Sequence, residues 1–247
     1  MKIIFICTKS ITFNTFLKSQ ADYFIKRGHE VAVACSDSNK LNFKRDLTYN
    51  IDFPNRIVEL LNPFSYLKIF IQIRRLINKN SSGIFYLHTP LASHLFRLFS
   101  FFNKIKIIYF VHGFRFTINS NKLKGIFFKI IEKILSYKTN IFITINKHDF
   151  NYIRSNYNKK ASCHKINGVG LDLLPKHFKN KIKNKKEIKK ILVIAAYKKD
   201  KGYLEILKVA ELLKNRDINI VCYGYGNPSK YNYIKTKKKL NNIFFNN

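Results

Sequence analysis

Residues 2–35 read KIIFICTKSITFNTFLKSQADYFIKRGHEVAVAC and contain two short apolar runs with a helical pattern between them. The runs Lys2–Cys7 and VAVAC at the end of Glu30–Cys35 are continuously apolar, as expected of strands buried on both faces. Apolar residues recur at helical spacing within Phe13–Arg27, and Gly28 suits a helix C-terminus. A strand, a helix and a strand within about 35 residues predict a parallel crossover unit.

The same alternation continues along the chain. It predicts strands at Arg56–Leu61, Gly83–His88, Lys106–Val111, Asn140–Ile145 and Ser162–Ile166. Helices are expected between them at Tyr66–Ile77, Leu91–Phe102, Leu123–Ser136 and Lys147–Ser155. Strands that alternate with helices predict an α/β class with a parallel sheet covered on both faces, a doubly wound, Rossmann-like domain.

Composition changes in residues 176–190, which hold eight lysines and one glutamate. We interpret this segment as an exposed basic linker between a domain at 1–175 and a second one at 191–247. In the second part the alternation restarts, with strands expected at Ile191–Ala196, Ile218–Tyr223 and Ile243–Phe245 and helices at Tyr203–Lys214 and Tyr231–Leu240. Two or three strands cannot bury both faces of a sheet, so we expect the second domain to be incomplete.

The charge is strongly basic, with 46 Lys+Arg against 14 Asp+Glu and a formal net charge of +32. An anionic partner would explain it, and nucleic acid, an anionic membrane face and phosphorylated substrates are the candidates. Compositional drift in an AT-biased genome, which enriches Lys, Asn, Ile and Phe, is the alternative. The four cysteines lack metal-ligand spacing, and Cys7, Cys35 and Cys222 are expected to be buried free thiols in a reducing compartment.

The first apolar run is too short for a secretory signal, and no uncharged apolar run reaches the length of a bilayer span. These observations predict a cytoplasmic protein. Several chemistries lack their motifs: there is no Asp-x-Asp metal motif, P-loop, nucleophile elbow or G-x-G-x-x-G dinucleotide loop. Metal-ligand spacing is also absent among five other histidines, which are His88, His94, His148, His164 and His177.

Ligands of open α/β sheets bind beyond the carboxyl ends of the strands, so the segments after each strand carry the candidate chemistry. His112-Gly113 follows one strand and could place an imidazole at a cleft, or could cap the next turn. Lys201-Gly202 lies before a predicted helix, where positive side chains suit a diphosphate, although a solvated lysine turn is the simpler explanation.

Seven segments in order resemble glycosyltransferase family 4, the retaining GT-B transferases, and in particular the branch of capsule, exopolysaccharide and O-antigen assembly. They are NTFL (Asn14–Leu17), KRGHEVAVAC (Lys26–Cys35), YLHTPLASHLFRL (Tyr86–Leu98), YFVHGFRF (Tyr109–Phe116), IEKILSYKTNIFITINKHDF (Ile131–Phe150), NGVGLDL (Asn167–Leu173) and DKGYLEILKVAELL (Asp200–Leu213). Together they are specific for the family and not for the sugar. The resemblance implies a GT-B-like enzyme that moves a sugar from a nucleotide-sugar donor, used as a substrate, to an acceptor.

The resemblance also implies roles for individual residues. His112 would lie near the transferred sugar as the catalytic residue, and Gly113 would sit beside the donor. Lys201 and Gly202 would face the donor diphosphate and stabilise the leaving nucleotide without a metal. Asn14, Thr15 and Asn146 would line the acceptor cleft.

Three departures from the family pattern stand out. Ala196 stands where Arg or Glu is usual, and His148 stands where an acidic residue is usual. The chain also ends before an E-x7-E region that holds the donor, so we expect a truncated product of impaired activity.

Acceptors in this family are usually lipid-linked, which implies a peripheral position at the inner face of the cell membrane. Tyr66–Ile77 and the Phe99–Lys106 region mix aromatic, apolar and basic residues as a headgroup interface would, although Ile69 and Ile73 suit a helix core better. Two alternatives stay open: a non-catalytic basic protein that binds anionic membrane or nucleic acid, and another GT-B enzyme such as a nucleotide-sugar epimerase. No nucleic-acid motif is present, so no specific nucleic-acid partner is expected.

Overall fold

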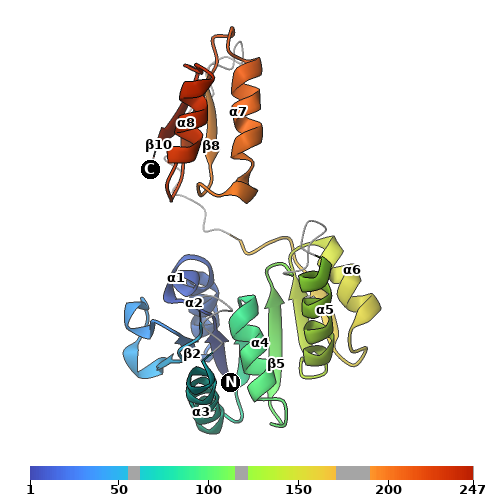
Figure 1. Ribbon diagram of the computed structural model, residues 1–247. Coiled ribbons are helices and arrows are strands. Elements are labelled where there is room, and N and C mark those ends of the chain that lie inside the picture. The colour runs from blue at the N-terminus through green and yellow to red at the C-terminus, as the bar shows by residue number, and fades with distance from the viewer. Residues whose placement is uncertain (55–61, 115–121, 171–189, 247) are drawn as a thin grey trace. The chain divides into compact units, whose positions relative to one another are not determined.

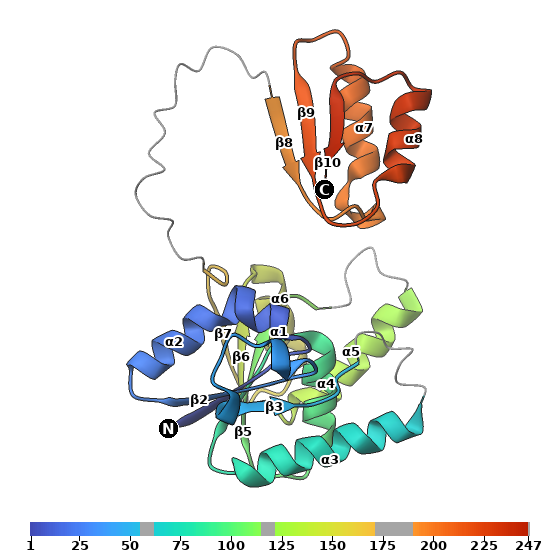
Figure 2. The same ribbon diagram turned by 90° about the vertical axis from the view of Figure 1, so that its left-hand side faces the viewer.

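The computed structural model describes residues 1–54, 62–114, 122–170 and 190–246, which form two compact units divided between Leu173 and Leu174. Unit 1 is built on a seven-stranded parallel sheet in the order β3-β2-β1-β4-β5-β6-β7 (Figures 1 and 2). Its strands are β1 (Lys2–Ile6), β2 (Glu30–Cys35), β3 (Thr48–Asn50), β4 (Ile84–Leu87), β5 (Lys106–Val111), β6 (Ile141–Thr144) and β7 (Ser162–Lys165). The strand order reverses between β1 and β4, which confirms the doubly wound α/β class.

The first crossover helix begins immediately after the loop that follows β1. It consists of α1 (Ser10–Thr12), a π-helical turn (Phe13–Leu17) and α2 (Lys18–Lys26), and it ends at Gly28 with φ +78°. Gly28 therefore occupies the left-handed position that commonly terminates a helix, as the sequence predicted. Two single turns of 3-10 helix, Ser38–Lys40 and Arg45–Leu47, then lead into β3.

The remaining helices of unit 1 are α3 (Pro63–Lys79), α4 (Pro90–Phe99), α5 (Lys122–Ser136) and α6 (Lys147–Asn156). Helix α3 starts where the sequence provides a cap: the Asn62 side chain accepts a hydrogen bond from the Phe64 amide at 3.0 Å, and Pro63 occupies the first turn. The start of α3 therefore precedes the predicted Tyr66, because the apolar periodicity begins only after the cap.

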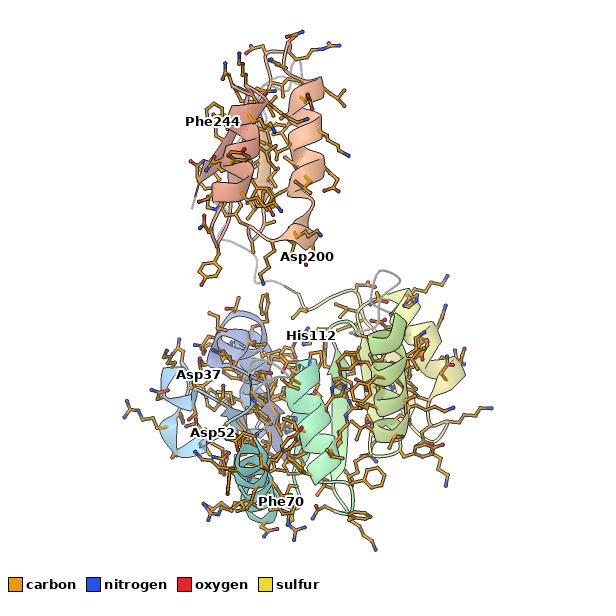
Figure 3. The ribbon with its side chains drawn as sticks, viewed as in Figure 1. Asp37, Asp52, Phe70, His112, Asp200 and Phe244 are labelled. Atoms are coloured by element: carbon orange, nitrogen blue, oxygen red, sulfur yellow. The ribbon has the colours of Figure 1, made fainter. Side chains whose placement is uncertain are left out.

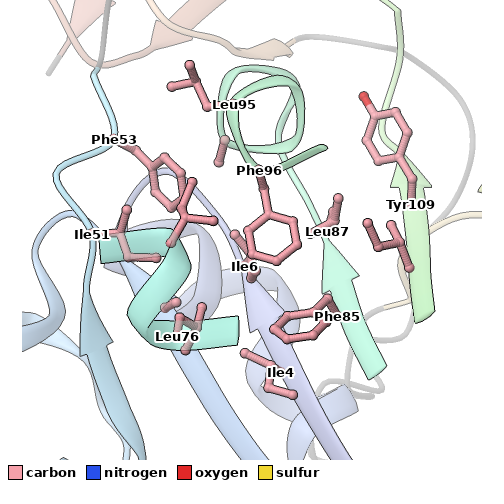
Figure 4. Packing of buried hydrophobic residues seen from close by; sticks show 14 of the residues in the cluster. Ile4, Ile6, Ile51, Phe53, Leu76, Phe85, Leu87, Leu95, Phe96 and Tyr109 are labelled. Atoms are coloured by element: carbon pink, nitrogen blue, oxygen red, sulfur yellow. The ribbon is translucent and has the colours of Figure 1, made fainter. Parts of the chain in front are cut away.

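Two hydrophobic clusters cover the two faces of the sheet. One packs the inward residues of α3 and α4 on Ile4, Ile6, Phe85 and Leu87 (Figure 4). The other packs Phe13, Leu17 and Ala21 on Ile3, Phe5 and Phe110 from the opposite face. Alternate residues of one strand thus enter different clusters, which explains why the sequence shows unbroken apolar runs.

Unit 2 has a three-stranded parallel sheet in the order β10-β9-β8. Its strands are β8 (Lys190–Ile194), β9 (Asn219–Tyr223) and β10 (Ile243–Asn246), with helices α7 (Tyr203–Leu212) and α8 (Ser229–Lys237) and a 3-10 turn at Lys199–Lys201. The helices pack on one face through Tyr203, Leu207 and Tyr231. On the other face Leu192, Ile194 and Phe244 are exposed. Figure 3 labels Phe244 in unit 2.

The strand expected at Arg56–Leu61 lies outside the described residues, and so does the predicted basic linker apart from Lys190. The sheet instead gains β3 from Thr48–Asn50, which pairs with Val33–Cys35 of β2. The sequence did not predict β3 because an edge strand of three partly exposed, mainly polar residues has no apolar run. Cys7, Cys35 and Cys222 are buried and free, as expected, while Cys163 is partly buried.

Candidate functional site

The carboxyl edge of the unit 1 sheet gathers polar groups where the strand order reverses. Strands β1, β4 and β5 are neighbours, so the residues that follow them, Thr8, His88 and His112, lie at one edge. Binding crevices of open α/β sheets form at such a reversal. Figure 3 shows His112 at this edge of unit 1.

Two threonines join the loops after β1 and β4. The Thr8 amide donates to Thr89 Oγ1 at 3.0 Å, and the two hydroxyl oxygens are 2.8 Å apart. Thr89 has φ +66°, which is rare for a β-branched residue and costs on the order of 1–3 kcal/mol. A strained residue held by two hydrogen bonds keeps the start of α4 in one position beside the edge.

The loop after β1 is held by residues that follow β2. Asp37 Oδ1 accepts from the Ser10 amide at 2.6 Å, and the Ser36 hydroxyl donates to the Thr8 carbonyl at 2.7 Å. The Asp37 carboxylate therefore stands at the N-terminus of α1, where a negative charge is favoured and Lys9 offers no side-chain cap.

Asn14 and Thr15, predicted to line the acceptor cleft, lie in the π-helical turn that follows α1. The Asn14 amide group donates to the Lys40 carbonyl at 3.0 Å and accepts from the Asn42 amide at 2.9 Å. These bonds give Asn14 a structural task, which is to hold the segment after β2. Thr15 is exposed. A role for either residue towards an acceptor stays a prediction.

His88 and His112 are hydrogen-bonded to each other across β4 and β5. His88 Nδ1 lies 3.2 Å from His112 Nε2. The His88 ring is fully buried and lies parallel to the Phe5 ring, with centroids 5.6 Å apart and planes 2° apart. The Phe110 ring also packs against both histidines. Stacking fixes the His88 ring, and its hydrogen bond then orients His112.

Both imidazoles are held in the neutral form. Burial lowers the pKa of His88 well below its usual range, and the neighbouring His112 lowers that pKa further. Burial also lowers the pKa of His112, which is partly exposed. Desolvation disfavours an imidazolium, so near neutral pH His112 offers a ligand an uncharged ring.

Gly113 follows His112 with φ +139°, a conformation that side-chain-bearing residues rarely adopt. A methyl group added there would meet no atom within 4 Å among the described residues. The glycine is thus required by the backbone conformation and not by packing. The space beside Gly113 would let a ligand approach the backbone next to the imidazole.

Asn146 is part of a helix cap. Its Oδ1 accepts from the Asp149 amide at 2.8 Å, and its Nδ2 donates to Asp149 Oδ2 at 2.8 Å. The first bond is the N-cap that begins α6, and the second ties the two side chains together. The cap uses Asp149, which directly follows His148. The first turn of α6 therefore still contains an acidic residue, although His148 stands where the family usually has one. Participation of Asn146 in a cleft stays a prediction.

The candidate donor residues of unit 2 lie between β8 and α7. Gly202 has φ +73° and begins α7, so the glycine is required for the turn. Lys201 is about half exposed, and its Nζ is 3.9 Å from Asp200 Oδ2. The lysine is therefore solvated and carries at most a weak ion pair. The contact of Lys201 with a donor diphosphate stays a prediction.

A buried ionic cluster in unit 1 escaped the sequence reasoning. Glu132 of α5 accepts from His94 at 2.7 Å and from Arg97 at 2.9 Å, and the Arg97 guanidinium lies 4.3 Å from the centre of the Tyr109 ring. Burial alone would raise the pKa of Glu132, but the Arg97 charge and His94 outweigh it and lower that pKa to about 2. The only signal in the sequence was a glutamate in an otherwise apolar and basic helix.

Next to this cluster, a pocket of about 290 Å³ lies between α4 and α5 and is lined mainly by apolar side chains. Among the described residues, no group of three or more His, Cys, Asp or Glu side chains could hold a metal ion. None of the helices described is long and apolar enough to cross a membrane.

Residues 2–146 match the model of a family described as "Glycosyl transferase 4-like". This range is more than half of the chain and includes both His88 and His112.

Two curated proteins are similar in sequence. The putative glycosyltransferase EpsD of Bacillus subtilis (strain 168) is 27% identical over 176 residues, which cover 69% of this chain and 44% of EpsD. An uncharacterized 41.2 kDa protein in the cps region of Klebsiella pneumoniae is 29% identical over 166 residues, 62% of this chain and 46% of that protein. The chain thus spans less than half the length of the curated relatives it matches.

Among solved structures, a sucrose-phosphate synthase from Thermosynechococcus elongatus aligns with a TM-score of 0.71 at 12% identity. The alignment covers 99% of this chain and 70% of that structure. At this identity the likeness shows the fold.

Proposed function

The chain belongs to the glycosyl transferase 4-like family, and on this premise we propose that it takes part in transferring a sugar from a nucleotide-sugar donor to an acceptor in bacterial surface polysaccharide synthesis. The names of the relatives, one a putative glycosyltransferase and one from a cps region, support this setting. The observation that carries the proposal is the neutral, oriented imidazole of His112 beside Gly113 at the carboxyl edge of the sheet.

The proposed chemistry is retaining and metal-independent, and it divides the work between the two units. A neutral imidazole with a fixed orientation can form a hydrogen bond to the transferred sugar without adding charge near the reacting carbon. Lys201, whose half-exposed ammonium group forms only a weak ion pair with Asp200, stabilises the diphosphate as negative charge develops on the leaving nucleotide. Gly202 lets the backbone turn so that the first amides of α7 point toward the same phosphates.

Turnover of nucleotide sugars tests this proposal. A panel of UDP-, GDP- and dTDP-sugars is incubated with the chain and with bacterial membrane extract as a source of lipid-linked acceptor, and nucleotide release is measured. We expect one donor class to be consumed, and His112→Ala to slow its consumption by on the order of a hundredfold. His164→Asn, on the exposed side of β7, is the matched histidine control and should retain the wild-type rate.

Failure of every donor to bind or react would remove the proposal. An equal loss in the His112 and His164 variants would remove the role of His112. If the donor sugar is changed without transfer to an acceptor, the chain would be an epimerase instead.

We also propose that unit 1 contacts an anionic membrane through α3 and α5. Helix α3 exposes Phe64, Leu67 and Ile71 next to Lys68, Arg74 and Arg75, while Ile69 and Ile73 are buried in the core as expected. Helix α5 exposes four apolar residues at helical spacing, with lysines between them; the apolar residues are Ile126, Phe127, Ile130 and Ile134. Exposed apolar side chains among basic ones suit a headgroup interface.

Liposome flotation tests the membrane contact. Binding is expected to rise with the fraction of anionic lipid and to fall with salt, and Ile126→Glu with Ile130→Glu is expected to weaken it severalfold. Leu212→Glu, at an 83% exposed apolar position on α7, is the matched control. Equal binding to neutral and anionic liposomes would show that the charge of the lipid does not contribute. Equal weakening by the α5 double variant and by Leu212→Glu would show that α5 is not the contact surface.

A further inference from the structure

The imidazole ring of the inner histidine, His88, has only one hydrogen-bond partner among the described residues. Its Nδ1 lies 3.2 Å from His112 Nε2, while its Nε2 is buried without a hydrogen-bond partner. The surrounding rings, Phe5, Tyr86 and Phe110, present no acceptor to that nitrogen and hold the ring in place. The position of the proton on His88 therefore determines which groups are left unsatisfied.

Two arrangements of one proton between the rings are possible while both are neutral. If His112 Nε2–H donates, then His88 Nε2 must carry its own proton, which leaves a buried N–H without an acceptor. If His88 Nδ1–H donates, then His88 Nε2 is a bare lone pair. A buried donor without a partner is the rarer and costlier case, so the second arrangement is favoured.

We propose that His88 is a positioning residue that sets the tautomer of His112. Its Nδ1–H donates to His112 Nε2 and leaves the His112 proton on Nδ1, so the outer histidine presents an N–H donor at the carboxyl edge. The ligand atom that meets it must then be an acceptor, such as a sugar oxygen or a phosphate oxygen. This inference rests on the proposed function only for the identity of that ligand. The same logic, an orienting group behind a histidine, operates in hydrolase triads.

Nitrogen-15 NMR of the free chain, selectively labelled at histidine, measures the tautomer directly. The spectrum is recorded at pH 8, and the His112 signals are assigned by their disappearance in His112→Asn. We expect His112 to carry its proton on Nδ1, against the Nε2–H form that a free imidazole side chain prefers in water. A wild-type His112 protonated at Nε2 would overturn the proposal, with no variant needed.

Two substitutions at His88 separate the hydrogen bond from packing. His88→Phe keeps an aromatic ring on Phe5 but has no N–H to donate, so His112 should shift to the Nε2–H form. His88→Asn places an amide N–H where Nδ1 was, so it should restore the Nδ1–H form. Unchanged His94 and His164 signals check that the variants are folded. A His112 tautomer that is the same in wild type and His88→Phe would contradict the proposal.

Turnover then connects the tautomer to catalysis. With the nucleotide sugar that the panel identifies, His88→Phe is expected to lower kcat/KM by about 10- to 100-fold, by analogy with groups that orient a metal-binding histidine, and His88→Asn to recover most of it. If no nucleotide sugar reacts with any form, the proposed function fails while the NMR result still decides the tautomer. If the tautomer shifts but kcat/KM does not change, His112 does not act as a hydrogen-bond donor in the reaction.

Discussion

The carboxyl edges of the two sheets follow the same strand-turn-helix plan, but their candidate residues lie in opposite environments. In unit 1 the edge is formed by a fully buried His88, a partly buried His112 and a strained Thr89, each bonded to a neighbour. In unit 2 the edge offers Lys201, which is half exposed and carries a weak ion pair. Burial amplifies electrostatic interactions, so the buried surroundings of His88 and His112 favour their neutral form, whereas water screens the charge of the half-exposed Lys201. Lys201 supplies charge without a fixed geometry.

The largest effect on stability is expected for the buried ion pair of unit 1, and it tests whether burial makes this pair more important than an exposed ion pair of unit 2. Glu132→Gln removes a carboxylate that is 2% exposed and leaves the buried Arg97 charge without its partner. We expect a loss of about 3–5 kcal/mol in the free energy of unfolding, measured by urea denaturation. Glu211→Gln, which removes the exposed pair with Lys238 in unit 2, is the control and should cost under about 1 kcal/mol. Equal losses would show that burial is not the deciding factor.

The next largest effect on stability is expected at Gly224, where the backbones that follow β8 and β9 come close together at the edge of unit 2. A Cβ at Gly224 would lie 1.9 Å from the Ala195 carbonyl oxygen, so β8 and β9 would have to separate. Gly224→Ala is expected to destabilise unit 2 by about 1–3 kcal/mol, read from hydrogen exchange of β8 and β9 amides. Gly28→Ala in unit 1, where φ is +78° but no atom lies within 4 Å, isolates the conformational cost. A smaller effect at Gly224 than at Gly28 would show that the strand end is adaptable.

The pH dependence of stability distinguishes the two edges directly. Because burial lowers the folded-state pKa of His88, the unfolded chain binds the proton more tightly, starting near its ordinary pKa of about 6.5. Stability is therefore fully present above about pH 6.5 and is lost as pH falls toward the folded pKa, by up to about 1.4 kcal/mol per pH unit for His88. His88→Phe should flatten this limb in chemical denaturation series from pH 8 to 5. An unchanged limb would mean that another group is responsible.

The smallest effect on stability is expected at Lys201. Lys201→Gln should change the free energy of unfolding by less than about 0.5 kcal/mol, since its side chain is half exposed. Affinity for the nucleotide diphosphate should nevertheless fall, measured by calorimetry at low and at physiological salt. A variant that loses stability but not affinity would reverse the comparison and make Lys201 a structural residue.

Apolar periodicity predicted the main elements well, as β5 and β2 show. Both were expected at the residues where the structure has them, because strands buried on two faces leave an unbroken apolar run. Strand β3 and the cap at Asn62 were missed because their stabilising contacts are polar and local. Asn146 follows β6, and its predicted place in a cleft stays a prediction, whereas the hydrogen bonds to Asp149 that define its cap became visible only in the folded chain.

The candidate site was predicted only in part. His112 and Gly113 stood out because a histidine and a glycine follow a buried strand, and the rule for α/β sheets puts such residues at a binding edge. His88 was recognised only as a histidine without ligand spacing. Its importance comes from the adjacency of β4 and β5, which brings residues 24 positions apart within 3.2 Å of each other.

Composition and apolar spacing were therefore enough to establish a basic α/β chain, the order of its main elements and the edge that carries the candidate residues, because these depend on short-range periodicity. The pairing of His88 with His112, the burial of Glu132 with Arg97, and the strain at Thr89 depend on which strands and helices become neighbours. Those contacts join residues distant in sequence, and their strength comes from the exclusion of water around them, so only the tertiary structure could decide them.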